Sequence, residues 1–344
     1  MNKLITLCII IALLPTIASA TKYIRDDTTG GDATSIGTWD LSTKTCTLAN
    51  AVSEKIQIMD DGITLDGAGY TVTAKSDNGI YLFGISGVTI KNVIVTGSQR
   101  GIALVNSYYN TVTNNTIELN ISAGIQLDSS DDNVIADNIV TSTTATGIAL
   151  IIGSDNNTLI GNTISNNEKG IYFQSSSNEN TIYNNNFIDN VTQASGDETS
   201  TGNIFYLDLS IGGNYWSDYD GLDIDCDGIG DTEIPYIFSG GEDALPWVDQ
   251  DGWLYVYPDP ESRLEKLIET VASLNLENGI NNSLDAKLQN ALDALEAKNA
   301  GQRQDAINKM QAFINAVEAQ SGDKIPESNA DYLIAVANCI ISLL

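Results

Sequence analysis

Histidine is absent from this chain of 344 residues, and basic residues are scarce. Without imidazole, the chain lacks the commonest metal ligand and the commonest general base. Only 16 Lys and Arg stand against 45 Asp and Glu, so the formal net charge is −29. Because nucleic acids are bound through basic surfaces, we expect no nucleic-acid partner. A strongly acidic polysaccharide is also disfavoured, unless cations bridge it to the protein.

Long apolar runs are missing except at the N-terminus. Residues 1–20, MNKLITLCIIIALLPTIASA, combine one lysine, an apolar stretch and a small-residue end, as in a secretory signal peptide. Neither this stretch nor residues 332–344 are long enough to cross a bilayer core of ~30 Å. We therefore predict no membrane span and a mature protein that starts at Thr21. It would be secreted or on the cell surface, or periplasmic in a two-membrane host.

What the sequence does contain is a repeat of 22 or 23 residues, marked by the dipeptide Gly-Ile. The dipeptide begins at Gly79, Gly101, Gly124, Gly147 and Gly170. A line of asparagines keeps nearly the same spacing: Asn92, Asn115, Asn138, Asn162 and Asn185. An apolar line does so as well: Val112, Ile135, Leu159 and Ile182. Self-similarity at a fixed period is the mark of a repeat architecture.

Each period holds three short segments in which β-branched residues alternate with polar ones, so we predict three strands per period and no helix. Such a unit closes as one coil of a right-handed parallel β-helix, whose coils stack at ~4.8 Å. The isoleucine and leucine lines would then form the core. The recurring asparagines would form hydrogen-bonded ladders at the corners.

These repeats resemble those of NosD-type periplasmic and surface proteins, within the wider group of carbohydrate-binding and sugar-hydrolase β-helices. The entry "IQIMDDGITLDGAGYTVTA" and the exit "GGNYWSDYDGLDIDCDGIGDTEIPY" carry the resemblance, over Gln57 to Trp247. We predict an N-terminal cap over residues 21–56 and repeats over residues 57–208.

Residues 209–258 are predicted to be an acidic and aromatic cap, since the period ends there and aromatic residues gather. A solenoid needs such a cap over its last coil, and sugar-binding platforms also use aromatic rings. Packing in the cap is the favoured reading, with some rings left for a ligand. The possible ligand-binding residues are Trp216, Tyr219 and Trp247.

Residues 259–344 change to helical periodicity and are predicted to form a small all-α bundle of four helices. Asp259-Pro260 supplies the start of the first helix. The segments "LENGINNSLDAKLQNAL" and "AINKMQAFINAVEAQSGDKI" resemble the FIMAH-type domain attached to many secreted hydrolases and surface proteins. The resemblance implies an accessory or docking role. Cys339 lies on the last apolar stripe, where we expect an inert thiol.

The stretch "GLDIDCDGIGDTEIPY" resembles a calcium-binding loop of the EF-hand kind. Its metal-binding positions would be Asp223, Asp225, Asp227, Ile229 and Asp231. Gly228 would permit the sharp turn, while Ile234 stands where such loops have a bidentate glutamate. We therefore predict weakly bound, structural calcium, with a solvated acidic turn as the alternative.

Copper handling is a further alternative because the NosD resemblance implies it. Copper sites use His, Cys or Met, and the mature chain has no His and only Met59 and Met310. Of the remaining cysteines, Cys46 and Cys226 would lie at opposite ends of the coils, ~30 Å apart at the strand spacing. We expect the Cys226 side chain to point away from the metal.

Catalysis on a glycan is the third alternative, as a lyase, hydrolase or epimerase. Hydrolysis needs paired carboxylates, and acidic residues stand near corresponding coil corners: Asp128, Asp131, Asp132 and Asp155. We expect them to be solvated and assign no catalytic residue. Five possible N-glycosylation sites also occur: Asn114, Asn120, Asn156, Asn190 and Asn281. The favoured hypothesis is a non-catalytic protein that binds a polysaccharide or another envelope component.

Overall fold

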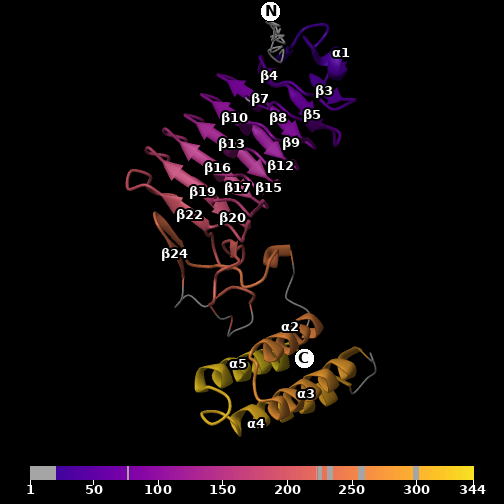
Figure 1. Cartoon of the computed structure of the whole chain (residues 1–344), viewed down its shortest axis with the longest axis vertical. Helices are drawn as coiled ribbons and strands as arrows, with labels where there is room; N and C mark the ends of the chain where they lie inside the picture. The colour runs from indigo at the N-terminus through magenta and orange to yellow at the C-terminus, as the bar shows by residue number, and fades with distance from the viewer. Residues whose placement is uncertain are drawn as a thin grey trace, which may run out of the picture.

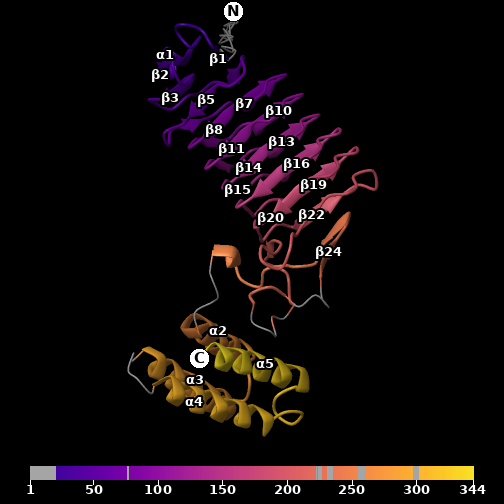
Figure 2. The same cartoon turned by 180° about the vertical axis from the view of Figure 1, so that it is seen from behind.

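The computed structural model describes residues 21–75, 77–221, 223, 227–230, 235–254, 260–296 and 302–344. The repeat region forms a parallel β-helix of about 7 turns, and four long helices form a bundle beyond its C-terminal end (Figures 1 and 2). The predicted fold class is therefore confirmed. Among the described residues, no helix has the length and apolar composition of a membrane span.

Three sheets run along the β-helix, and their strands pair in parallel except for β2, which pairs antiparallel with β3. Sheet A contains β1 (Lys22–Ile24), β4 (Ile56–Ile58), β7 (Asn78–Phe83), β10 (Arg100–Val105), β13 (Ala123–Asp128), β16 (Thr146–Ile151), β19 (Lys169–Gln174) and β22 (Thr192–Gly196). Sheet B contains β2 (Gly37–Asp40), β3 (Thr45–Leu48), β5 (Thr64–Asp66), β8 (Thr89–Lys91), β11 (Thr111–Thr113), β14 (Val134–Ala136), β17 (Thr158–Ile160) and β20 (Thr181–Tyr183). Sheet C contains β6 (Thr71–Val72), β9 (Ile94–Thr96), β12 (Thr116–Glu118), β15 (Ile139–Thr141), β18 (Thr163–Ser165), β21 (Asn186–Ile188) and β23 (Tyr215–Trp216).

The Gly-Ile repeat has a steric cause. Each isoleucine is fully buried and pairs with the isoleucine of the next coil, as Ile125 does with Ile148. A Cβ on Gly124 would lie 2.4 Å from the Val140 side chain and 2.7 Å from the carbonyl oxygen of Gly147. Only glycine therefore fits at this corner, where the chain runs against the next coil.

The predicted asparagine ladder is confirmed and is fully buried. The Nδ2 group of Asn115 donates to Oδ1 of Asn138, and the pattern continues through Asn162, Asn185 and Asn214 at 2.8–3.0 Å. The left-handed conformation falls on the residue before each of the first four ladder positions, and these residues are Asn114, Asp137, Gly161 and Asn184. Asn92, which the sequence spacing placed in the asparagine ladder, has a φ of 54°. It therefore belongs to this line of left-handed residues and not to the ladder.

Residues 21–56, predicted as a cap, supply strands to the first coil. β1 pairs with β4, and β3 pairs with β5. The short helix α1 (Ala33–Ile36) buries Ala33 and Ile36 at the end of the core. The first coil thus includes this segment, with α1 as its cover.

The C-terminal bundle contains α2 (Pro260–Ser273), α3 (Asn278–Glu296), α4 (Gln302–Glu318) and α5 (Glu327–Leu343). α2 contacts α3 and α5, and α4 contacts the same two helices, so the four surround one core. That core includes Leu264, Leu288, Phe313 and Leu333, all essentially inaccessible to solvent. Between the coils and the bundle, the hairpin β24 (Tyr236–Phe238) and β25 (Gly241–Asp243) and the turn η1 (Gly252–Leu254) belong to the cap.

Candidate functional site

The outer face of sheet A carries a column of side chains between two tyrosines. Tyr81, Ala103, Gln126, Ala149 and Tyr172 pair in register along five successive strands. They face outward because their chain neighbours on either side are fully or almost fully buried in the core. The four coil steps from Tyr81 to Tyr172 span about 19 Å at the usual strand spacing. We call these five residues the outer column.

Both tyrosines are partly exposed, while the three residues between them form a low floor with at most 7% exposure. Two alanines on that floor let an extended ligand approach the backbone between the rings. Phe83 extends the aromatic surface, since its ring stacks on Tyr81 at 6.4 Å between centroids. The arrangement is a flat platform with aromatic rings at its ends.

Three cations border the outer column, although the chain as a whole is strongly acidic. Lys169 Nζ lies 3.9 Å from the centroid of the Tyr172 ring, and Lys55 Nζ lies 5.5 Å from that of Tyr81. Arg100 Nε donates to the side-chain oxygen of Gln126 at 2.7 Å. The platform therefore offers donors and aromatic faces together.

The corner aspartates serve the stacking of coils. Asp131 Oδ1 accepts the backbone N–H of Asp155 at 2.9 Å, and Asp155 Oδ1 accepts that of Asn178 at 2.7 Å. Desolvation raises the pKa of Asp131, and the nearby charges of Asp155 and Asp132 add to the effect. Asp128 faces outward on sheet A, where its partners in register are Val105 and Ile151. No second carboxylate therefore stands beside Asp128 on the neighbouring strands.

The acidic loop is described only at residues 223 and 227–230, and Asp225 and Asp231 lie outside the described residues. Asp223 is buried, and its Oδ2 accepts the backbone N–H of Gly228 at 3.0 Å. Gly228 has a φ of +90°, as the predicted sharp turn requires. Asp227 Oδ1 accepts the backbone N–H of Ile229 at 2.8 Å.

Pairing with the next segment of the cap orients the backbone of Ile229. Val248 N–H donates to the Gly228 carbonyl, and Gly230 N–H donates to the Pro246 carbonyl. Because peptide groups alternate along an extended chain, the Ile229 carbonyl points away from that segment. Within the part of the chain that the structure describes, no three His, Cys, Asp or Glu side chains gather as a metal site.

Two of the three predicted ligand-binding aromatics are packed inside the cap. Trp216 has no exposed surface and stacks between Phe187 at 4.3 Å and Tyr236 at 4.4 Å. Trp247 is 8% exposed and donates to Asn184. Their large apolar rings close the last coil, so neither presents a face to a ligand. Tyr219 is partly exposed and lines a cavity between the cap and the bundle.

Asp243 is a buried residue that the sequence pattern did not reveal. It ends the asparagine ladder: Oδ2 accepts the backbone N–H of Asn214 at 2.7 Å and Trp216 Nε1 at 2.9 Å. Oδ1 accepts the backbone N–H of Leu245 at 3.1 Å. Burial raises the pKa of this carboxyl to about 6, against the lowering effect of its donors. Asp243 lies beyond the last repeat, so the repeat spacing could not identify it.

The possible glycosylation sites divide by exposure. Asn114 and Asn156 are exposed, and Asn281 is partly buried. Asn120 and Asn190 are buried, and their side chains hydrogen-bond between coils at another corner. Since a glycan needs an accessible amide, the prediction for these last two does not fit their positions in the folded chain.

Of the two described cysteines, Cys46 and Cys339, only the second differs from the expectation. Cys46 is a free, buried thiol, and desolvation raises its pKa to about 12. Cys339 takes part in a disulfide, so its prediction as an inert thiol is wrong. An apolar stripe shows that a residue is buried but not what it bonds to. Cys226 lies outside the described residues.

Comparisons with family models agree with this architecture. The helical bundle matches the model of the FIMAH domain over residues 264–342. Two solved structures are similar, the periplasmic alginate epimerase AlgG and a double mutant of it. They share 19% and 20% sequence identity with this chain, cover 60% and 52% of it, and give TM-scores of 0.34 and 0.38.

The chain spans less than half of those structures, 46% and 39% respectively. No curated protein matches it. The model of the family described as "Periplasmic copper-binding protein (NosD)" matches residues 22–221, which is more than half of the chain and contains all three sheets of the β-helix. The chain therefore belongs to the NosD family.

Proposed function

We propose that this is an extracytoplasmic, non-catalytic protein that binds a glycan on the outer face of sheet A. The observation that carries the proposal is the outer column, with two tyrosine rings about 19 Å apart on a rigid platform. Sugar rings bind aromatic faces through their apolar C–H surfaces, and their hydroxyls need fixed donors and acceptors at the edges. Arg100, Gln126 and Lys169 provide such groups here.

A location outside the cytoplasm is supported by two features. Residues 1–20 have the pattern of a secretory signal peptide. The disulfide at Cys339 is typical of proteins in an oxidising compartment.

Binding without catalysis is favoured by the surroundings of the carboxylates. Glycoside hydrolysis uses two carboxyl groups that face each other across the scissile bond. On sheet A, Asp128 has Val105 and Ile151 as its partners in register. Asp131 and Asp155 are engaged with backbone N–H groups of the next coil. The outer column itself contains no carboxylate.

Structural calcium in the acidic loop is part of the proposal. Three features support it: the turn at Gly228, the Ile229 carbonyl that is not used in pairing with residues 246–248, and a buried Asp223 whose Oδ1 has no hydrogen-bond partner. Arg263 opposes it, because its guanidinium pairs with the other oxygen of Asp223 at 2.7 Å. We expect weak binding, measured as a rise in melting temperature with Ca²⁺ that an Asp227→Ala variant lacks.

Copper, which the family description names, does not fit the donors in the part of the chain that the structure describes. The chain has no histidine. Cys46 is buried and holds its proton, and Cys339 is in a disulfide. Met310 is fully buried in the helical bundle. Copper sites need several accessible soft or imidazole ligands. Among the described residues only Met59 remains as a partly exposed soft donor, so we assign the chain no copper-binding function.

The test of binding against catalysis is to incubate the protein with a panel of neutral and uronic polysaccharides. We expect at least one polymer to be retained without change in length. New reducing ends or unsaturated ends would show cleavage and would refute the non-catalytic assignment. Retention of none would refute glycan binding.

A further inference from the structure

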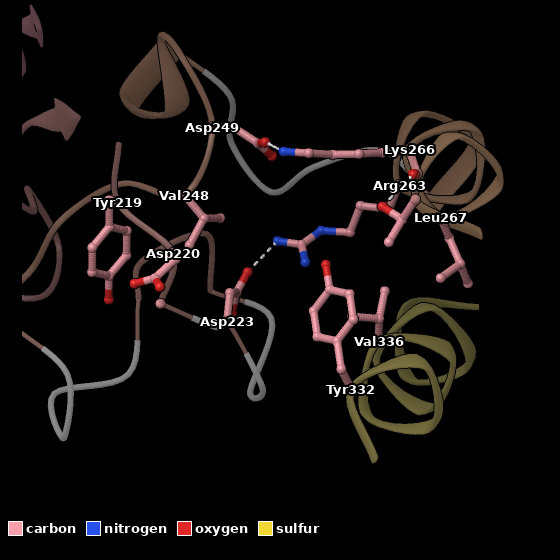
Figure 3. A pocket seen from close by; sticks show the side chains of 12 residues that line it. Tyr219, Asp220, Asp223, Val248, Asp249, Arg263, Lys266, Leu267, Tyr332 and Val336 are labelled. Atoms are coloured by element: carbon pink, nitrogen blue, oxygen red, sulfur yellow. Dashed lines mark hydrogen bonds and ion pairs between the residues drawn. The ribbon is translucent and has the colours of Figure 1, made fainter. Parts of the chain in front are cut away.

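A cavity of about 380 Å³ lies where the cap meets the helical bundle. The cap contributes Tyr219, Asp220, Asp223 and Asp249, and the bundle contributes residues of α2 and α5 (Figure 3). The volume falls in the range of small-molecule sites, about 300–1,000 Å³, and far exceeds the ~30 Å³ of one water molecule. The cavity shares no residue with the outer column.

A buried ion pair stands at the wall of this cavity. Arg263 Nη2 lies 2.7 Å from Asp223 Oδ2, with side-chain exposures of 9% and 4%. Figure 3 shows the two side chains reaching toward each other from α2 and from the acidic loop. The pair joins the bundle to the cap.

Each partner keeps one buried polar atom that is not satisfied. Asp223 Oδ1 accepts no hydrogen bond, and Arg263 Nε donates none. A buried acceptor or donor left in this state costs about 1–3 kcal/mol, and more when the group is charged. The ion pair at the cavity wall is therefore incompletely satisfied, although these two atoms themselves have no surface open to the cavity.

The other residues that line the cavity determine which kind of ligand it can bind. Tyr219 and Tyr332 supply aromatic surface from opposite sides of the junction, and Leu267 and Val336 supply apolar surface. Thr270 adds a hydroxyl. Lys266 forms an ion pair with Asp249 at the edge, so its charge is already matched.

We propose that this junction cavity binds a small hydroxyl-rich ligand, a single sugar unit or the end of a glycan. A hydroxyl is both donor and acceptor. A sugar hydroxyl can therefore donate to the Asp220 carboxylate or hydrogen-bond to the Thr270 hydroxyl at the cavity wall, while the sugar ring packs against tyrosine. Because ligand contacts come from the cap and from α2 and α5, binding also stabilises the docking of the bundle.

The test is isothermal titration of the full mature protein with methyl glycosides of glucose, galactose, mannose and galacturonic acid. A chelator is present, because Asp223 also belongs to the loop proposed to hold calcium. We expect at least one glycoside to bind at millimolar concentration. Binding of none contradicts the proposal.

Two variants locate the site. Thr270→Trp fills the cavity and is expected to abolish binding, while Ser273→Trp, exposed on the same helix and outside the cavity, leaves it unchanged. Arg263→Lys keeps a positive partner for Asp223 but loses the planar guanidinium at the cavity wall, and we expect at least tenfold weaker binding. Binding that survives Thr270→Trp or Arg263→Lys contradicts the site.

A third variant distinguishes binding in the junction cavity from binding on sheet A. The double change Tyr81→Ala and Tyr172→Ala removes the platform on sheet A and leaves the junction intact. Methyl glycoside binding that persists in this variant, even if polysaccharide retention is lost, supports the junction site on its own. Loss of glycoside binding in it would place the sugar on sheet A and refute the junction site.

Discussion

Asp243 is expected to make the protein less stable as the pH rises through the mildly acidic range. The carboxyl is fully buried, and desolvation raises its pKa from 3.8 to about 6. Its donors favour the charged form but do not offset the burial. The folded protein therefore binds this proton more tightly than the unfolded chain does. The stabilisation is fully present below the unfolded pKa and is lost as the pH rises through about 6.

The magnitude follows from the shift. A change of about two pKa units corresponds to about 3 kcal/mol, of which some 2–3 kcal/mol is lost between about pH 4 and pH 7.5. Asp243→Asn removes the titration and keeps the size of the side chain. The melting temperature of the wild type, relative to that of this variant, should fall by roughly 5–10 °C over the same interval.

Asp197→Asn serves as a control, because the contribution of Asp197 to stability should change with pH in the opposite direction. The backbone N–H of Ser175, followed by the Thr199 hydroxyl, lowers the pKa of Asp197 to about 2. The wild type should therefore lose stability relative to this variant as the pH falls below 3.8. Melting followed by circular dichroism measures both differences. A wild type that gains stability over Asp243→Asn with rising pH would show that the hydrogen bonds outweigh desolvation, and would refute the reasoning.

Three further predictions concern the stacking of coils and the cysteines. Asn162→Ala breaks the buried ladder on both sides and should lower the free energy of unfolding by about 3 kcal/mol or more. Asn308→Ala, at an exposed position on α4, should change it little. Equal effects of the two variants in calorimetry would refute the ladder's role. Gly124→Ala places a methyl group 2.4 Å from Val140, so soluble yield and melting temperature should fall, and an unchanged melting temperature would contradict the steric argument. A non-reducing digest analysed by mass spectrometry should find Cys339 joined to Cys226, since Cys46 is free and residues 1–20 are expected to be removed. A free Cys339 thiol in the digest would contradict this pairing.

The coils could be predicted because each turn repeats the same physical problem. Gly124 and its equivalents mark a corner where no side chain fits, and Asn138 and its equivalents satisfy buried backbone groups. Such requirements recur at a fixed spacing and can be read from the sequence alone. The amphipathic stripes of α2 to α5 are local patterns and could be read in the same way.

The site could be predicted only in part, because its residues depend on non-periodic contacts. Tyr81 and Tyr172 each follow a core isoleucine, so their outward direction was implicit, but their pairing across four coils needs the register. Composition identified Trp216 as a cap residue and could not tell a buried ring from an exposed one. The pairing of Asp223 with Arg263 joins residues 40 positions apart in different domains, and no local pattern predicts it.

The central claim is that the outer face of sheet A binds a glycan. The most direct measurement is the affinity of the retained polysaccharide for the wild type, for the double variant Tyr81→Ala and Tyr172→Ala, and for Tyr183→Ala on sheet B. Each stacking tyrosine contributes about 1 kcal/mol, so the double variant should bind roughly 30-fold more weakly. Tyr183→Ala should bind like the wild type. Equal affinity in all three proteins would contradict the account.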